Sequence, residues 1–228
     1  IIDFDSNASF LGDVSIDGSL NINGNLDVSG TLSANGGNAS GDFSIALGKE
    51  TIADGSYSFV VGYDTRASGE NSTAMGNDTT ASGKNSTTIG RLTEASGDYS
   101  TAIGNQSKAL GDNSTAMGQN TEASGEFSTA MGFNSTASGE SSTAMGEGTD
   151  ASGNYSTAMG KGTKAYGQFS TAMGSGTEAS NLNSVAMGEN TIASGKFSTA
   201  MGRSTIAYGE HSTVMGKYND VSDALFVI

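Results

Sequence analysis

Small, apolar and polar residues recur along most of the chain in a fixed order. From Gly41 the sequence divides into thirteen consecutive blocks of fourteen residues that end at Ser222, without insertion or deletion. Glycine opens twelve of the blocks, Asn181 opens the other, and glycine stands at position 8 of all thirteen. Short alternating segments between glycines are typical of β-strands and turns. The period therefore predicts two strands and two turns per block, which is one coil of a parallel β-solenoid.

A helical interpretation of the same spacing is excluded by the glycines. A glycine near every seventh residue can be mistaken for a heptad, but each interior glycine costs a helix about 1 kcal/mol relative to alanine. Segments such as 128–131 (STAM) and 121–124 (TEAS) instead suit strands of about five residues between glycine corners. We expect an all-β chain in which neighbouring coils pair at about 4.8 Å.

A second, shorter repeat precedes the blocks. Glycine recurs every six residues, and apolar residues occupy the third and fifth positions of each unit; these glycines are Gly12, Gly18, Gly24, Gly30 and Gly36. Such short alternating strands predict a narrow interchain β-prism or triangular β-helix. The expected organisation is a lead-in at 1–11, the hexapeptide segment and its joint at 12–40, the β-roll at 41–222, and a truncated C-terminal strand or cap at 223–228.

Alternation across each strand divides the block into inner and outer positions. Position 4 is serine in every block, position 6 is nearly always alanine, position 11 is mostly threonine or serine, and position 13 is alanine except at Val221. Small residues facing small residues predict a thin roll with these four positions inside. Its stacked hydroxyls are expected to hydrogen-bond along the axis.

Position 7 is then on the outside, and it is apolar in every block. All nine methionines of the chain occur there, together with leucine, valine and isoleucine. A stripe of this size is too large for a soluble monomer to expose. Burying it offers about 20–40 kcal/mol as an upper bound, against association costs of about 4–15 kcal/mol. We expect copies of the chain to cover it around a rotation axis. The alternative, methionine inside and alanine outside in a monomer, stays open.

The residues assigned to the interface between chains share position 7. They are Met75, Ile89, Ile103, Met117, Met131, Met145, Met159, Met173, Met187, Met201 and Met215.

Charge and composition exclude several classes of function and structure. The net charge of −14 with only ten Lys and Arg argues against nucleic acid and fits an acidic extracellular surface. The chain has no cysteine, so it has no disulfide framework. It has no apolar run of about 18 residues and no signal peptide, so we expect a fragment of a longer protein that does not itself insert into a membrane.

Catalytic and metal-binding chemistry is not predicted. His211 is the single histidine and stands at position 3, where Phe, Tyr and Asn also occur. The position-4 serine recurs in every block, which is typical of a structural residue. We therefore expect no enzyme, no catalytic residue, no metal site and no cofactor.

The fourteen-residue block resembles the repeat of a known family. Residues 183–188 (NSVAMG) and 191–195 (TIASG) are similar to the YadA-type head repeat of trimeric autotransporter adhesins. The resemblance implies a left-handed parallel β-roll, a homotrimer, a cell-surface location, and attachment to host or matrix surfaces. Threonine usually replaces the family's valine at position 5, and methionine replaces isoleucine at position 7. The hexapeptide segment and residues 216–228 resemble parts of viral tail fibres, so a virion fibre remains an alternative carrier.

Three functions follow as hypotheses. The first is a multivalent adhesin that binds a host protein or a glycan; the second is a structural spacer of a virion or cell-surface fibre. The third is ice binding by the threonine column at position 5. Exposed aromatic residues at turn positions are the candidate ligand contacts, namely Tyr63, Phe133, Tyr166 and Tyr208. Aromatic residues at position 3 either stack on ligand or fill the space between chains.

Overall fold

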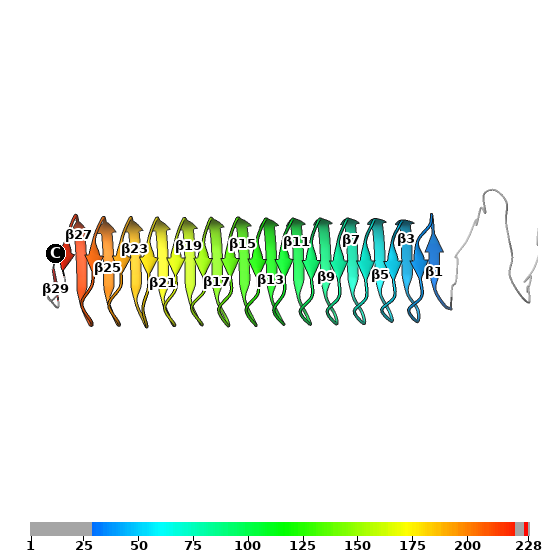
Figure 1. The fold of residues 1–228 in the computed structure, drawn as a ribbon, viewed down its shortest axis with the longest axis horizontal. Coiled ribbons are helices and arrows are strands. Elements are labelled where there is room, and N and C mark those ends of the chain that lie inside the picture. The colour runs from blue at the N-terminus through cyan, green and yellow to red at the C-terminus, as the bar shows by residue number, and fades with distance from the viewer. Residues whose placement is uncertain (1–28, 222–225, 228) are drawn as a thin grey trace, which may run out of the picture.

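The protein forms a long parallel β-solenoid in which successive coils stack side by side along one axis (Figure 1). The computed structural model describes residues 29–221 and 226–227. Each coil gives one longer strand to a fifteen-stranded sheet and one shorter strand to a fourteen-stranded sheet. Within the described residues every regular element is a strand, and the all-β parallel solenoid of thirteen fourteen-residue coils is confirmed.

The long-strand sheet is built from the odd-numbered strands, which cover positions 5 to 9 of each block. They are β1 (Leu32–Ala34), β3 (Ile45–Lys49), β5 (Phe59–Tyr63), β7 (Thr73–Asn77), β9 (Thr87–Arg91), β11 (Thr101–Asn105), β13 (Thr115–Gln119), β15 (Thr129–Phe133), β17 (Thr143–Glu147), β19 (Thr157–Lys161), β21 (Thr171–Ser175), β23 (Val185–Glu189), β25 (Thr199–Arg203), β27 (Thr213–Lys217) and β29 (Phe226–Val227).

The short-strand sheet is built from the even-numbered strands, which cover positions 12 and 13. They are β2 (Asn38–Ala39), β4 (Ile52–Ala53), β6 (Arg66–Ala67), β8 (Thr80–Ala81), β10 (Glu94–Ala95), β12 (Lys108–Ala109), β14 (Glu122–Ala123), β16 (Thr136–Ala137), β18 (Asp150–Ala151), β20 (Lys164–Ala165), β22 (Glu178–Ala179), β24 (Ile192–Ala193), β26 (Ile206–Ala207) and β28 (Asp220–Val221).

The second strand of each coil is shorter than the five residues that the sequence predicts. It ends after position 13, because the next two N–H groups converge on one carbonyl of the following coil. The N–H groups of Ser124 and Gly125, for example, both donate to the carbonyl of Ala137, at 3.0 and 3.3 Å. Two residues facing one interrupts a regular ladder, as a β-bulge does.

The solenoid begins before the first fourteen-residue block. Leu32 of β1 pairs with Ile45, and Ala39 of β2 pairs with Ala53, so residues 32–39 form a coil where the sequence predicts a joint. At the other end, Phe226 of β29 pairs with Thr213. The predicted lead-in and most of the hexapeptide segment lie at residues 1–28, outside the described residues, as do 222–225 and 228.

Alanine, serine and threonine fill the interior as predicted. The alanines at positions 6 and 13 are 0% exposed throughout, and the serines at position 4 and threonines at position 11 are also buried. The alternative with methionine inside a monomeric roll is therefore wrong. Seven of the thirteen position-4 serine hydroxyls bond within their own coil instead of along the axis, as Ser128 Oγ does to the carbonyl of Gly125 at 2.6 Å, and the other six have no hydrogen-bond partner. Thr121 Oγ1 donates a hydrogen bond to Ser107 Oγ of the preceding coil at 3.0 Å, which is the expected kind of hydrogen bond along the axis.

The two glycine positions are required for different reasons. Gly146, at position 8, has a φ of +133°, and a Cβ there would lie 1.9 Å from the carbonyl oxygen of Gly160 in the next coil. Gly139, at position 1, does not have a positive φ, but its Cβ would lie 2.1 Å from the carbonyl oxygen of Gly153. Positive φ therefore occurs at position 8 and not at position 1, while close packing of the coils favours glycine at both.

Candidate functional site

The outer face of the long-strand sheet carries the residues assigned to the interface between chains. In-register pairing puts position 7 of each coil beside position 7 of the next, as in Met131 opposite Met145 and Met145 opposite Met159. The residues at position 7 from Leu47 to Met215 therefore form one continuous column, the apolar stripe. Its most exposed members are Met75 at 36%, Ile89 at 39% and Met117 at 39%. Whether a second chain covers the stripe stays a prediction.

Different side chains border the stripe on its two sides. The position-5 residues, mostly threonine, are half-buried in every coil. Position 9 is mostly exposed and carries ion pairs between neighbouring coils, such as Lys161 Nζ to Glu147 Oε1 at 3.1 Å and Arg203 Nε to Glu189 Oε2 at 3.3 Å. The stripe thus has one weakly polar flank and one charged flank, as an apolar contact surface with a polar rim does.

The four predicted ligand-contact residues are exposed but are not brought together. Tyr63 and Phe133 end the long strands β5 and β15, whereas Tyr166 and Tyr208 follow the short strands β20 and β26. Their exposed fractions are 43%, 44%, 40% and 50% in that order. The ammonium groups of Lys49 and Lys164 lie over the rings of Tyr63 and Tyr166 at 5.5 and 5.9 Å. They stand at two different corners and several coils apart, so any ligand would meet them separately.

A different row of aromatic residues lies on the surface at position 3, which the sequence left between two interpretations. The side chains at this position follow one another along the axis, and we call the rings among them the aromatic ladder. Neighbouring rings stack where they are adjacent: Phe43 on Tyr57 at 5.4 Å and Phe197 on His211 at 4.9 Å between centroids. The ladder consists of Phe43, Tyr57, Tyr99, Phe127, Tyr155, Phe169, Phe197 and His211.

The backbone under the ladder is in an unfavourable conformation for bulky residues. All thirteen residues at position 3 have φ between +52° and +59°. Asparagine and glycine tolerate this region, but for a large side chain it costs about 1–2 kcal/mol. Asn71 and Asn113 occupy the same position in other coils, so asparagine, which has the lower conformational cost, is compatible with it. The aromatic rings are therefore present at the surface despite a conformational cost. The mixing of asparagine with aromatic residues at one turn position is the sequence signal that could have indicated this.

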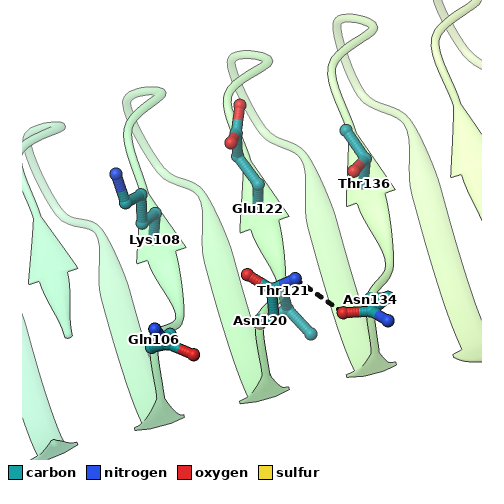
Figure 2. Close-up of a pocket in the computed structure, with 7 residues that line it drawn as sticks. All are labelled: Gln106, Lys108, Asn120, Thr121, Glu122, Asn134 and Thr136. Carbon is teal, nitrogen blue, oxygen red and sulfur yellow. Dashed lines mark hydrogen bonds between the residues drawn. The ribbon is translucent and has the colours of Figure 1, made fainter. Parts of the chain in front are cut away.

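A shallow polar hollow of about 260 Å³ lies along the outside of the short-strand sheet (Figure 2). Position 10 contributes amides, of which Asn120 Nδ2 donates to Asn134 Oδ1 at 2.6 Å, and position 12 contributes Lys108 and Glu122. Figure 2 shows these side chains in two rows on successive coils. One row consists of neutral amides, and the other carries one cation and one anion on neighbouring coils, which is typical of a solvated face and offers no grouping of reactive residues.

Two side chains on the surface, Asp150 and Tyr155, have raised pKa values. Burial raises the pKa of Asp150, and a hydrogen bond from Ser152 and the charge of Lys164 oppose that rise only in part. The hydrogen bond to Glu140 raises the pKa of Tyr155, whose Oη donates to Glu140 Oε1 at 2.8 Å. The Tyr155 shift comes mainly from a contact between adjacent coils, whereas the Asp150 shift comes mainly from burial.

The residues with nucleophilic or basic character are kept apart by the fold. The position-4 serines are buried, so a substrate cannot reach them, while His211 is on the surface and stacks on Phe197. Within 29–221 and 226–227, no three His, Cys, Asp or Glu side chains gather as a metal site would need. The described part of the chain also contains no helix that is long and apolar enough to cross a membrane.

Comparison with known families identifies the repeat. The family model of the YadA head domain repeat, which spans two copies, matches residues 39–65, 67–92, 95–121, 123–149, 151–177, 179–205 and 193–219. No curated protein matches the chain. The matched segments cover most of the solenoid, each spanning about two fourteen-residue coils. The chain therefore belongs to the YadA head domain repeat family.

Proposed function

We propose that this chain is a non-enzymatic, homotrimeric fibre head that acts outside the cell and attaches to a host protein or glycan through many equivalent contacts. The observation that carries the proposal is the apolar stripe: one uniform apolar column on one face of a module that belongs to an adhesin head family. Adhesion by a rod of identical coils favours multivalency, because linked weak contacts add through a high effective concentration.

The energetics of the stripe support a second surface beside it. Each stripe residue already buries more than half of its surface within its own chain, and 39% or less remains to be covered. Full burial of one such side chain contributes about 1.5–3 kcal/mol. Covering the remaining third of every side chain in the stripe therefore contributes roughly 6–13 kcal/mol per chain. This is smaller than the sequence-based bound and similar to the association cost of about 4–15 kcal/mol. The flanking threonine column therefore has to contribute to the interface as well.

Three copies around one axis satisfy this requirement with closed symmetry. A closed ring of chains hides every stripe, whereas an open arrangement leaves one exposed. Membership of the YadA head family supports three as the number of chains, and this arrangement leaves the short-strand sheets facing outward. The charged outer face of that sheet then keeps the acidic rod soluble.

Light scattering on the purified chain in dilute buffer tests the assembly. We expect a mass of three times 22.8 kDa. A stable species of single-chain mass contradicts the proposal. The adhesive part is tested separately, by binding of the trimer to immobilised matrix proteins and glycans at several surface densities. A trimer that binds none of them at any density indicates a spacer in place of an adhesin.

A further inference from the structure

One break in the aromatic ladder differs from the others. Asn183 stands at position 3 between Phe169 and Phe197, one coil away from each. Both flanking rings are backed by a second ring on their far side, because Tyr155 stacks on Phe169 at 5.1 Å and His211 stacks on Phe197 at 4.9 Å. The planes of these pairs are nearly parallel, at 13° and 6°. The two phenyl rings beside Asn183 are thus held with one face supported and the other turned toward the asparagine.

The spacing across Asn183 suits one further ring. Phe169 and Phe197 are two coils apart, which is about 10 Å along the axis. A six-membered ring placed midway lies about 5 Å from each phenyl ring, within the usual range for stacking on aromatic faces. Phe169 and Phe197 are 48% and 44% exposed, and Asn183 is exposed between them. An asparagine amide at the base offers both a donor and an acceptor.

The coil that carries Asn183 also departs from the repeat beside it. Asn181 replaces the glycine found at position 1 of every other block, and Leu182 is the one apolar residue at position 2. The Asn181 side chain fixes the local backbone: its Oδ1 accepts from the Leu182 N–H at 2.9 Å, and its Nδ2 donates to the carbonyl of Ser194 at 3.2 Å. In a sequence this regular, two singular residues next to the ring-flanked asparagine indicate a local role.

Charge separates this break from a similar one nearby. Ser141 lies between Phe127 and Tyr155, but Tyr155 Oη bonds to Glu140 at 2.8 Å, which ties that ring across the break beside a carboxylate. Around Asn183, position 2 carries Gln168, Leu182 and Lys196, without a carboxylate. A ligand that is rich in hydroxyl groups and is neutral or acidic fits this surface, whereas a cationic ligand finds no partner at position 2.

We propose that Phe169, Asn183 and Phe197 form a binding site for a pyranose ring of a glycan. The apolar C–H faces of the sugar stack on the two phenyl rings, and its hydroxyl groups bond to the Asn183 amide. This assignment rests on the proposed function, since it names the ligand class of the adhesive head. The site requires the ladder to lie outside the interface between chains, and the mixed composition of the ladder supports this, because rings, amides and serine do not repeat one contact as the uniform apolar stripe does.

Saturation-transfer NMR and calorimetry on the trimer test the site with cellohexaose, chitohexaose and a hyaluronan hexasaccharide as probes. At least one probe is expected to bind, with the largest transfer to its ring C–H protons. Phe169→Asn and Phe197→Asn use the residue already native to this position, so they keep the fold. Each is expected to weaken binding about three- to tenfold, and the pair to abolish it. Phe43→Asn removes an equivalent ring elsewhere in the ladder and is expected to bind as the unchanged protein does.

Asn183→Phe provides the opposite change. It completes the ladder from Tyr155 to His211, so it is expected to fill the site and abolish binding while the trimer remains folded. Absence of binding by all three probes, or equal binding by Phe169→Asn, Phe43→Asn and the unchanged protein, overturns the site. Light scattering on the same samples distinguishes this failure from failure of the proposed assembly, because the ladder variants leave the trimer mass unchanged.

Discussion

The two sheets of the solenoid share one interior and differ completely on their outer faces. Both contribute fully buried alanine to the core, at position 6 from the long strands and position 13 from the short strands. Outside, the long-strand sheet repeats apolar residues at position 7, whereas position 12 of the short-strand sheet varies among Arg66, Glu94, Lys108 and Ile192. The requirements of the coil therefore cannot explain the uniform stripe, because the other face folds with almost any residue.

Uniformity on an outer face indicates a contact that repeats with every coil. A solvated position tolerates substitution, and position 12 shows this, with ion pairs such as Lys108 Nζ to Glu94 Oε2 at 3.8 Å that contribute little on a surface. A position that meets an identical chain along the whole rod meets the same environment in each coil. The comparison between faces is therefore the strongest argument for assembly through the long-strand sheet.

The largest predicted effect comes from charging the stripe. Met145→Asp together with Met159→Asp puts two carboxylates per chain into the proposed interface, where each costs several kcal/mol to bury. We expect the trimer to dissociate or unfold, measured as a fall in light-scattering mass and in the unfolding temperature. Ile52→Asp with Thr80→Asp puts two carboxylates on the short-strand face, on either side of Arg66, and is expected to leave the mass unchanged. Equal behaviour of the two pairs contradicts the difference between the faces.

A smaller but still large effect is expected at the corner where a long strand ends. Gly146→Ala puts a Cβ 1.9 Å from the carbonyl oxygen of Gly160, at a φ of +133°, so adjacent coils must separate locally. We expect a loss of about 3 kcal/mol or more in the free energy of unfolding.

The neighbouring glycine of the same corner is the matched control. Gly148 has a φ of +62°, a Cβ added to it would meet no atom within 4 Å, and Asn134 occupies the equivalent position one coil earlier. Gly148→Asn is expected to be neutral or slightly stabilising in chemical denaturation, because asparagine tolerates the conformation and has less freedom when unfolded. Equal losses from the two substitutions contradict the importance of coil-to-coil contact at position 8.

Much of the fold could be predicted because the repeat is strict. The fourteen-residue period determines the register, and alternation from the position-4 serine to the position-7 methionine determines which side chains face inward. The short second strand could not be predicted, because it depends on two N–H groups sharing the carbonyl of Ala137. The coil at 32–39 could not be predicted because its spacing from the next coil is irregular. Leu32 pairs with a residue thirteen positions later and Ala39 with one fourteen positions later, which hides the period.

The functional surface was only partly predictable. The apolar stripe follows from periodicity, but the stacking of Phe169 and Phe197 on their outer neighbours depends on turn geometry that the period does not specify. The positive φ at position 3 is likewise a property of the coil. The asparagines found at this position are only a weak signal for a turn with positive φ at one residue. Selecting Phe169 and Phe197 for the proposed site among the exposed aromatic residues therefore required the structure.

The smallest predicted effect tests how permissive the short-strand face is. Burial raises the pKa of Asp150 above its ordinary value of 3.8, so the fold disfavours the charged carboxylate and binds the proton more tightly than the unfolded chain does. Stability is therefore reduced at neutral pH and recovers as the pH falls through the raised pKa toward 3.8. Because Asp150 is only partly buried and solvent screens its charge, Asp150→Asn is expected to raise stability at pH 7 by about 0.5 kcal/mol or less. Unfolding curves should show this difference disappearing below about pH 3, where the native aspartate is also uncharged; a difference that persists there indicates a steric cause.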